Sequence, residues 1–286
     1  MSDKNTVFHQ KLTLNLRGSL MDLSTPKVMG ILNLTPDSFY DGGRNNEMFN
    51  ALKQTERMLA EGAEMIDIGA YSSRPSAEHI SSGTEKTRLI PVLKQLVKQF
   101  PKAVFSIDTF RHEVAEAAID EGAYMINDIS GGEMDPEMFA TVARLKVPYI
   151  LMHMRGTPQT MLHQTNYKNI FDDVFSYFSK KVIQLKEIGV YDIVLDPGFG
   201  FAKTSEQSYE LLNKLDQFKI LGFPVLAGVS RKSMIYKFLD TSAHEALNGT
   251  TVANTIALLK GASILRVHDV KEAVEAVKIV SKINQM

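Results

Sequence analysis

Polar side chains interrupt several apolar runs of this chain, and each interruption falls near the carboxyl end of its run. Carboxylates and amides next to cations are the groups with which proteins recognise a polar ligand and hold an anion. Burying one such group without a partner costs about 1–3 kcal/mol, so each needs a neighbour or a ligand, and a shared polar pocket would supply both. The residues concerned are Asn33, Asp108, Asn127, Asp128, His153, Asp196, Ser230, Arg231, Lys232, Arg266 and His268.

Some of these residues also have a plainer interpretation. Asp108 precedes "TFRHEVAEA" and could cap a helix there. Asn127 could bond only to neighbouring loops, and Asp196 opens an Asp-Pro-Gly turn signal. Arg266 and His268 are two residues apart, so on a strand they project to the same side, which favours an anion site over a structural pair.

The remaining histidine pattern gives no metal site. Neither HxH nor HExxH occurs, which argues against zinc. We therefore interpret His79, His112, His153 and His163 as loop or surface side chains.

An alternation of strand-like and helix-like segments would position the polar set. Eight apolar runs have the length of strands that are buried on both faces. They are residues 27–34, 64–70, 103–109, 124–130, 148–154, 192–198, 224–230 and 263–270. Between them, residues 47–63 and 111–123 repeat apolar side chains at helical spacing and stop at Gly62 and Gly122. This pattern predicts an α/β fold, a closed (β/α)8 TIM barrel with its active site at the carboxyl ends of the strands.

An open, doubly wound sheet is the competing arrangement. Such sheets usually have fewer strands and a glycine-rich first turn, yet no GxGxxG follows the first run. Residues 11–23 alternate apolar and polar side chains about Arg17-Gly18, which predicts a β-hairpin covering the bottom of the barrel. We expect one domain over residues 1–286, with an N-terminal segment at 1–26 and the barrel at 27–286.

Composition excludes several classes of function. The chain has 286 residues, of which 44% are hydrophobic and 23% charged, as is ordinary for a globular protein. A net charge of −1 gives no electrostatic case for nucleic acid or an acidic membrane surface. The absence of cysteine excludes disulfides and thiolate catalysis. The N-terminus lacks an apolar signal core, and no apolar run reaches the length of a membrane span, so we expect a cytoplasmic protein.

Seven motifs, in one order, carry a resemblance to a known family. They are "MGILNLTPDSFYDGG", "MIDIGAYSSRP", "SIDTFRHEVA", "INDISGG", "LDPGFGFAKT", "GVSRKS" and "RVHDV". Over residues 27–285 the chain resembles the dihydropteroate synthases, pterin-binding enzymes of folate synthesis that sulfonamides inhibit. The resemblance implies a homodimeric transferase that uses Mg2+. It would join 6-hydroxymethyl-7,8-dihydropterin diphosphate to 4-aminobenzoate, giving 7,8-dihydropteroate and pyrophosphate.

The resemblance assigns one set of residues to the pterin. A flat ring edged with hydrogen-bond donors and acceptors needs an acid beside an amide. By resemblance Asp196 and Asn127 take these roles, with Asp108 nearby, and Lys232 bonds the carbonyl edge. The whole set is Asp108, Asn127, Met152, Asp196, Phe201, Gly228, Lys232 and Arg266.

Three members of that set would enclose the ring. Met152 and Phe201 would line the slot, although core packing alone would explain both residues. Arg266 could stack on the face of the ring.

The leaving diphosphate implies a second set. Its departure develops negative charge, which cations and a metal would stabilise. By resemblance the metal ligands are Asn33 and Asp41, and the diphosphate set is Asn33, Arg74, Arg266 and His268. The family mechanism is SN1-like: diphosphate leaves first, and the neutral arylamine attacks a pterin cation that Asp108 and Asp196 stabilise. The catalytic set is therefore Asp108, Asp196, Lys232, Asn33, Asp41 and Arg74.

The 4-aminobenzoate set implied by the resemblance is Phe39, Ser73, Pro75, Lys232 and Ser233. The carboxylate would meet the start of the helix after "SRK", where the helix dipole favours an anion. Residues 37–43 would form a flexible lid. The chain departs from the family pattern at Ser76, where glycine is usual, so the loop shape and the sulfonamide sensitivity could differ.

Three other functions compete with this interpretation. A methyltetrahydrofolate–corrinoid methyltransferase would share Asp108, Asn127 and Asp196 but would not need "SRKS", "RVH" or the loop after the first run. A Schiff-base aldolase would use Lys232 or Lys203. A catalytically inactive barrel that only binds ligands is the third alternative, and the complete set of polar residues argues against it.

Overall fold

The computed structural model describes residues 11–34, 43–75 and 77–285, apart from the side chains of residues 43–46. Its strands are β1 (Thr13–Leu16), β2 (Ser19–Asp22), β3 (Lys27–Asn33), β4 (Met65–Gly69), β5 (Val104–Asp108), β6 (Met125–Asp128), β7 (Tyr149–Met152), β8 (Ile193–Asp196), β9 (Leu226–Ala227) and β10 (Ile264–Val267). Its helices are α1 (Gly43–Ala60), α2 (Ser82–Gln99), α3 (His112–Asp120), α4 (Met138–Leu145), α5 (Ile170–Glu187), α6 (Ser205–Asn213), α7 (Ser233–Tyr236), α8 (Leu247–Leu259) and α9 (Val270–Asn284), with short 3-10 segments η2 (Met161–His163) and η3 (Leu215–Leu221).

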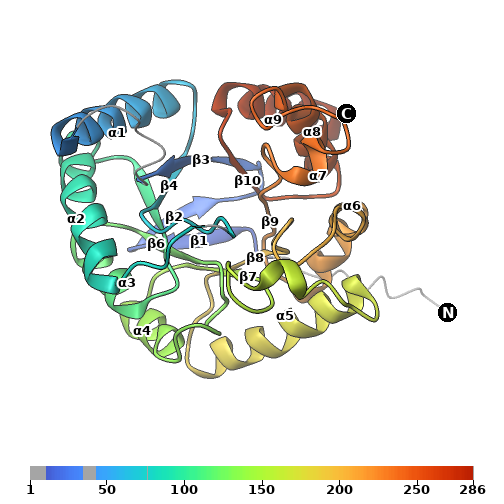
Figure 1. Ribbon diagram of the computed structural model, residues 1–286, viewed down its shortest axis with the longest axis horizontal. Coiled ribbons are helices and arrows are strands. Elements are labelled where there is room, and N and C mark those ends of the chain that lie inside the picture. The colour runs from blue at the N-terminus through green and yellow to red at the C-terminus, as the bar shows by residue number, and fades with distance from the viewer. Residues whose placement is uncertain (1–10, 35–42, 76, 286) are drawn as a thin grey trace.

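The strands from β3 to β10 form one parallel sheet that curls into a barrel inside a ring of helices (Figure 1). Their order is β8-β7-β6-β5-β4-β3-β10-β9, and a parallel bridge between Leu195 and Val225 brings the two edges of the sheet together. Each strand lies within one of the eight apolar runs. The predicted (β/α)8 barrel is confirmed, and the doubly wound alternative is wrong.

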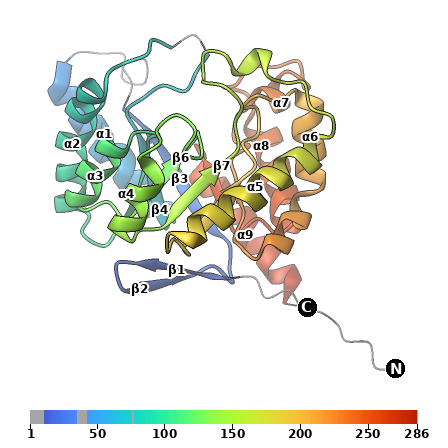
Figure 2. The same ribbon diagram turned by 90° about the horizontal axis from the view of Figure 1, so that it is seen from below.

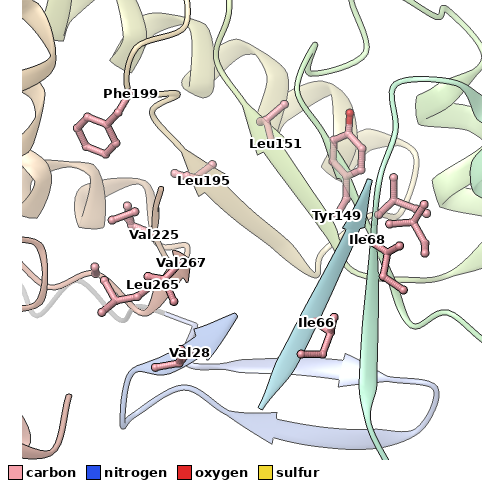
Figure 3. Close-up of a cluster of buried hydrophobic side chains, with 14 of the residues drawn as sticks. Val28, Ile66, Ile68, Tyr149, Leu151, Leu195, Phe199, Val225, Leu265 and Val267 are labelled. Atoms are coloured by element: carbon pink, nitrogen blue, oxygen red, sulfur yellow. The ribbon is translucent and has the colours of Figure 1, made fainter. Parts of the chain in front are cut away.

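The main core lies between the barrel and its helices. Outward-facing side chains such as Ile66, Leu151 and Leu265 are buried there (Figure 3). The predicted glycine stops are confirmed, because Gly62 and Gly122 follow α1 and α3 with φ of +103° and +113°, a region that favours glycine.

The N-terminal hairpin closes the amino-terminal end of the barrel. β1 and β2 pair antiparallel about Arg17 and Gly18, as predicted, and lie beneath the barrel (Figure 2). Leu14 and Leu23 are fully buried against the lowest layer of the barrel interior. The hairpin therefore seals one end, which leaves the carboxyl ends of the strands as the open end of the barrel.

Among the helices that the structure describes, none is long and apolar enough to cross a membrane.

Candidate active site

The interior layering of the barrel explains why polar side chains gather at its open end. The lowest inward layer is apolar and consists of Met29, Met65, Met125, Ile150, Val194, Leu226 and Ile264, with Val104 packed against it. Side chains alternate along a strand, so the residue two positions later also points inward, one layer higher. Those residues are Ile31, Asp67, Ser106, Asn127, Met152, Asp196, Gly228 and Arg266. The hydrophobic floor thus supports a mostly polar layer.

A cavity of about 170 Å³ opens above this layer and collects most of the predicted site. Its predicted residues are Asn33, Ser73, Arg74, Asp108, Asn127, Met152, Asp196, Phe201, Gly228, Lys232, Arg266 and His268. Pro75 and Ser233 are not part of its lining. Phe39, Asp41 and Ser76, with most of the predicted lid, lie outside the described residues.

Asp196 serves both as a turn residue and as a wall of the cavity. Its Oδ1 accepts a hydrogen bond from the backbone N–H of Gly198 at 2.8 Å, so the Asp-Pro-Gly turn orients the carboxylate. Gly198 has a φ of +69°, and a Cβ there would collide with the carbonyl of His153. Burial raises the pKa of Asp196, against the opposing charge of Lys232. The turn thereby holds the Asp196 carboxyl group at the cavity wall.

Arg266 joins two carboxylates beside Asn127. Its Nη2 donates to Asp108 at 2.8 Å and its Nε donates to Asp67 at 2.6 Å. The same Asp67 oxygen accepts from Asn127 Nδ2 at 2.8 Å. Arg266 is therefore fixed in place by charge-assisted bonds on two sides.

Two of the plainer interpretations do not describe the structure. The residue preceding α3 is Arg111, while the Asp108 side chain bonds to Arg266, so Asp108 is not the helix cap. Asn127 bonds to a strand residue, Asp67, rather than only to loops.

Asp67 is the residue that the sequence analysis missed. It lies in the middle of the run "EMIDIGA", whereas the predicted site residues lie near the carboxyl ends of their runs. The available signal was its spacing from Met65, because an acid two residues after a floor residue must face the interior.

Asp108 gives a prediction about stability. Burial raises the pKa of its carboxyl to about 7 from an ordinary 3.8, against the opposing charge of Arg266. Folding therefore favours the protonated form, and the associated stability is full below about pH 3.8 and lost as the pH rises through about 7. Asp108→Asn imitates the protonated form. We expect it to raise Tm at pH 8 by roughly 2–4 °C or more, and by less at pH 5. Equal shifts in thermal denaturation at both pH values would contradict this.

The segment that carries Lys232 is pinned from two sides. Arg231 has a φ of +54°, and its guanidinium bonds both oxygens of Asp269 at 2.8 Å. Lys232 Nζ then donates to the carbonyl of Phe199 at 2.5 Å and lies 4.7 Å from the ring centroid of Phe201. Burial lowers the pKa of Lys232 to about 8, against the pull of Asp196. A cationic donor therefore lies at the cavity wall near Asp196.

His268 lies at the cavity as an uncharged group. Its Nδ1 lies 3.0 Å from Ser230 Oγ, and its backbone N–H donates to the same oxygen at 3.1 Å. Burial, and then the charge of Arg266, lower the pKa of His268 to about 4. At neutral pH it can offer an anion a hydrogen bond but no charge.

His153 corrects the interpretation of the histidines. His79 and His163 are exposed, as predicted, but His153 is only 3% exposed. Lys203 Nζ lies 3.0 Å from His153 Nδ1 and donates to the carbonyls of His153, Gly198 and Phe201 at 2.9–3.1 Å. This buried contact ties the segment after β7 to the loop after β8, and it engages the Lys203 amine in structural bonds.

Within the described residues, no three His, Asp or Glu side chains are grouped to hold a metal. Asn33 lines the cavity, and its side chain makes no hydrogen bond to a described residue. One amide with substrate oxygens and water suits Mg2+, which rarely takes an all-protein cage.

The helix that begins at Ser233 is a single turn, so its dipole is smaller than we expected for binding a carboxylate.

Comparison with known proteins identifies the family. A profile described as pterin-binding enzyme matches residues 29–268. The dihydropteroate synthase of Synechocystis sp. is 46% identical, with 88% of each chain aligned, and that of Escherichia coli is 41% identical, with 94% of this chain and 95% of the relative aligned. The chain belongs to the dihydropteroate synthase family.

Solved structures of family members have the same fold. The Xanthomonas albilineans dihydropteroate synthase with 4-aminobenzoic acid superposes with a TM-score of 0.90 at 36% identity, covering 96% of this chain and 99% of the other. The Yersinia pestis enzyme in a sulfonamide complex also gives 0.90, at 39% identity, with 96% and 100% covered. These relatives do not favour the corrinoid methyltransferase or the aldolase.

Proposed function

We propose that this chain condenses 6-hydroxymethyl-7,8-dihydropterin diphosphate with 4-aminobenzoate, giving 7,8-dihydropteroate and pyrophosphate. The observation that carries the proposal is the convergence of Asp196, Asn127 and Lys232 on one small cavity at the open end of the barrel. An acid, an amide and a cation that line one cavity match the amino, ring N–H and carbonyl edge of a pterin. The family to which the chain belongs supports the same reaction.

The two faces of the pterin need different partners. Met152 and Phe201 lie in the cavity lining and supply apolar surface for a flat ring. Because the Arg266 guanidinium is held by Asp67 and Asp108, it can stack on a ring without moving.

The charges near the ring suit the departure of diphosphate. Asp67 and Asp108 carry two negative charges against the one positive charge of Arg266, which leaves −1 when both acids are ionised. Asp196 adds a third buried carboxyl group, whose charge Lys232 opposes. Fixed negative charge stabilises a positive charge that develops on the pterin, in agreement with an SN1-like reaction.

The diphosphate would occupy the rim of the cavity. Asn33, Arg74 and His268 lie in its lining, while Arg266 is already bound to two carboxylates. When bound, Mg2+ would offset the negative charge of the departing diphosphate, with Asn33 as one ligand and Asp41, outside the described residues, as the other.

The two reactions open to a pterin-binding barrel can be separated directly. We expect chromatography of a mixture of pterin diphosphate, 4-aminobenzoate, Mg2+ and the chain to show dihydropteroate. Methyltetrahydrofolate with reduced cobalamin should give no methyl transfer. The reverse pair of results would overturn the proposal in favour of the methyltransferase.

A sulfonamide should compete with 4-aminobenzoate, as the complex of the Yersinia pestis relative suggests.

A homodimer would cover apolar side chains that are more than half exposed on and around α8 and α9, which pack together: Phe238, Val252, Leu259, Ile279 and Ile283. Sedimentation equilibrium should show a dimer that Val252→Asp weakens; a wild-type monomer at micromolar concentration would contradict it.

A further inference from the structure

Asp67 lies behind the cavity wall rather than in it. It is fully buried in β4 and is not part of the cavity lining. Its Oδ2 accepts from Asn127 Nδ2 and from Arg266 Nε, both of which belong to lining residues. Its Oδ1 is buried and makes no hydrogen bond within the described residues. The function proposed above uses this acid to hold Arg266 and to supply negative charge, and gives no role to its contact with Asn127.

The contact decides which way the Asn127 amide faces. An ionised carboxylate can only accept, so the Asn127 atom nearest to Asp67 must be the NH2 group. The other end, Asn127 Oδ1, is buried and has no hydrogen-bond partner among the described residues. Leaving a buried acceptor without a partner costs free energy, and since Asn127 lines the cavity, a donor on a ligand would supply the missing bond.

We propose that Asp67 is a positioning residue that locks the Asn127 amide with its oxygen available to the pterin, and so makes the pocket select donors at that edge. The inference rests on the proposed function. With Asp196 also an acceptor, the ring must present hydrogen donors to both residues, as the 2-amino-4-oxo ring of a pterin does. A 2,4-dioxopteridine, which has an acceptor oxygen in place of the amino donor, is bound more weakly.

Without Asp67, the Asn127 amide can turn by half a rotation about the Cβ–Cγ bond. Its NH2 group then faces the ligand, so Asn127 donates a hydrogen bond to the ring instead of accepting one. The preference for the 2-amino ring over the 2-oxo ring then falls, even though Asp196 still contributes its own preference in both proteins. Asp67→Asn retains an acceptor oxygen for Asn127 and Arg266, so it retains the orientation. A role that was only structural would change overall affinity or stability and would leave the ratio unaltered.

The experiment measures dissociation constants of the 2-amino-4-oxo and 2,4-dioxo pteridines by calorimetry. The preference is the ratio of the two dissociation constants. We expect Asp67→Ala to reduce the wild-type ratio by about tenfold or more, and Asp67→Asn to have a ratio within about threefold of the wild-type value. An unchanged ratio in folded Asp67→Ala overturns the inference. If the wild-type chain binds neither pteridine, the proposed function fails instead.

A second measurement covers the case in which Asp67→Ala does not fold. In the wild-type chain, the side-chain NH2 signal of Asn127, identified by its loss in Asn127→Asp, should exchange slowly with solvent because it is bonded to buried Asp67. Exchange as fast as that of an exposed asparagine would overturn the inference without any change at Asp67.

Discussion

Asp196→Asn will weaken binding of the pterin diphosphate by about 100-fold or more, to the point of no measurable heat in calorimetry. The substitution keeps the shape of the side chain but removes its charge and one acceptor from the cavity wall, where Asp196 is only 5% exposed. The amino group and ring N–H of the pterin, both buried donors, would then face either the NH2 group of the new asparagine or its amide oxygen, which is a weaker acceptor than a carboxylate. The variant should fold, because burial raises the pKa of Asp196 and so opposes its charged form.

A matched substitution is available at the other end of the same strand. Asp192 precedes β8, pairs with Lys11 at 2.7 Å and accepts from the hairpin, well away from the open end of the barrel. Asp192→Asn should leave pterin affinity unchanged. Normal affinity in Asp196→Asn, or equal losses in both variants, would remove Asp196 from the pterin site.

Lys232→Met will lower kcat/KM for the pterin diphosphate by about 100-fold or more. Methionine keeps most of the apolar stem beside Phe201 but removes the cation whose charge interacts with Asp196. That loss affects the carbonyl edge of the pterin and removes the charge that most strongly offsets the burial of Asp196. Steady-state kinetics should show the loss chiefly in kcat/KM.

The pH dependence separates a loss of charge from a loss of packing. Burial lowers the pKa of Lys232 to about 8, so the wild-type ammonium loses its proton, and kcat/KM falls, as the pH rises through about 8. Arginine stays charged, so Lys232→Arg should lack this decline even if it is slower overall. Lys237→Met, at an exposed lysine just after α7, is the control and should behave as wild type. A decline near pH 8 that persists in Lys232→Arg would assign it to another group.

Strand positions were predictable because a parallel barrel buries both faces of every strand. That requirement makes each strand a short apolar run, and the eight runs matched the eight strands. The least accurate case is the run 224–230, of which only Leu226–Ala227 pairs as β9. Beyond it the chain turns through Ser230 and Arg231, whose bonds to His268 and Asp269 replace the ladder.

The polar site was only partly predictable, because its contacts join residues far apart in the chain. Asp67 accepts hydrogen bonds from Arg266, 199 residues away in the chain, and from Asn127, 60 residues away. His153 is buried and contacts Lys203, which is 50 residues away in the chain. No local sequence pattern predicts that contact. Polar residue types near the carboxyl ends of the apolar runs were enough to predict a pocket. Which residues bond to each other inside it depends on how the strands align around the barrel, and the sequence does not show that alignment.

The most direct test of the central claim is the release of pyrophosphate from 6-hydroxymethyl-7,8-dihydropterin diphosphate, measured with and without 4-aminobenzoate. With Mg2+ present, the wild-type chain should release pyrophosphate in step with dihydropteroate when 4-aminobenzoate is added, and Asp196→Asn should release almost none. No release by the wild-type chain in Mg2+, with both substrates present, would contradict the proposed reaction.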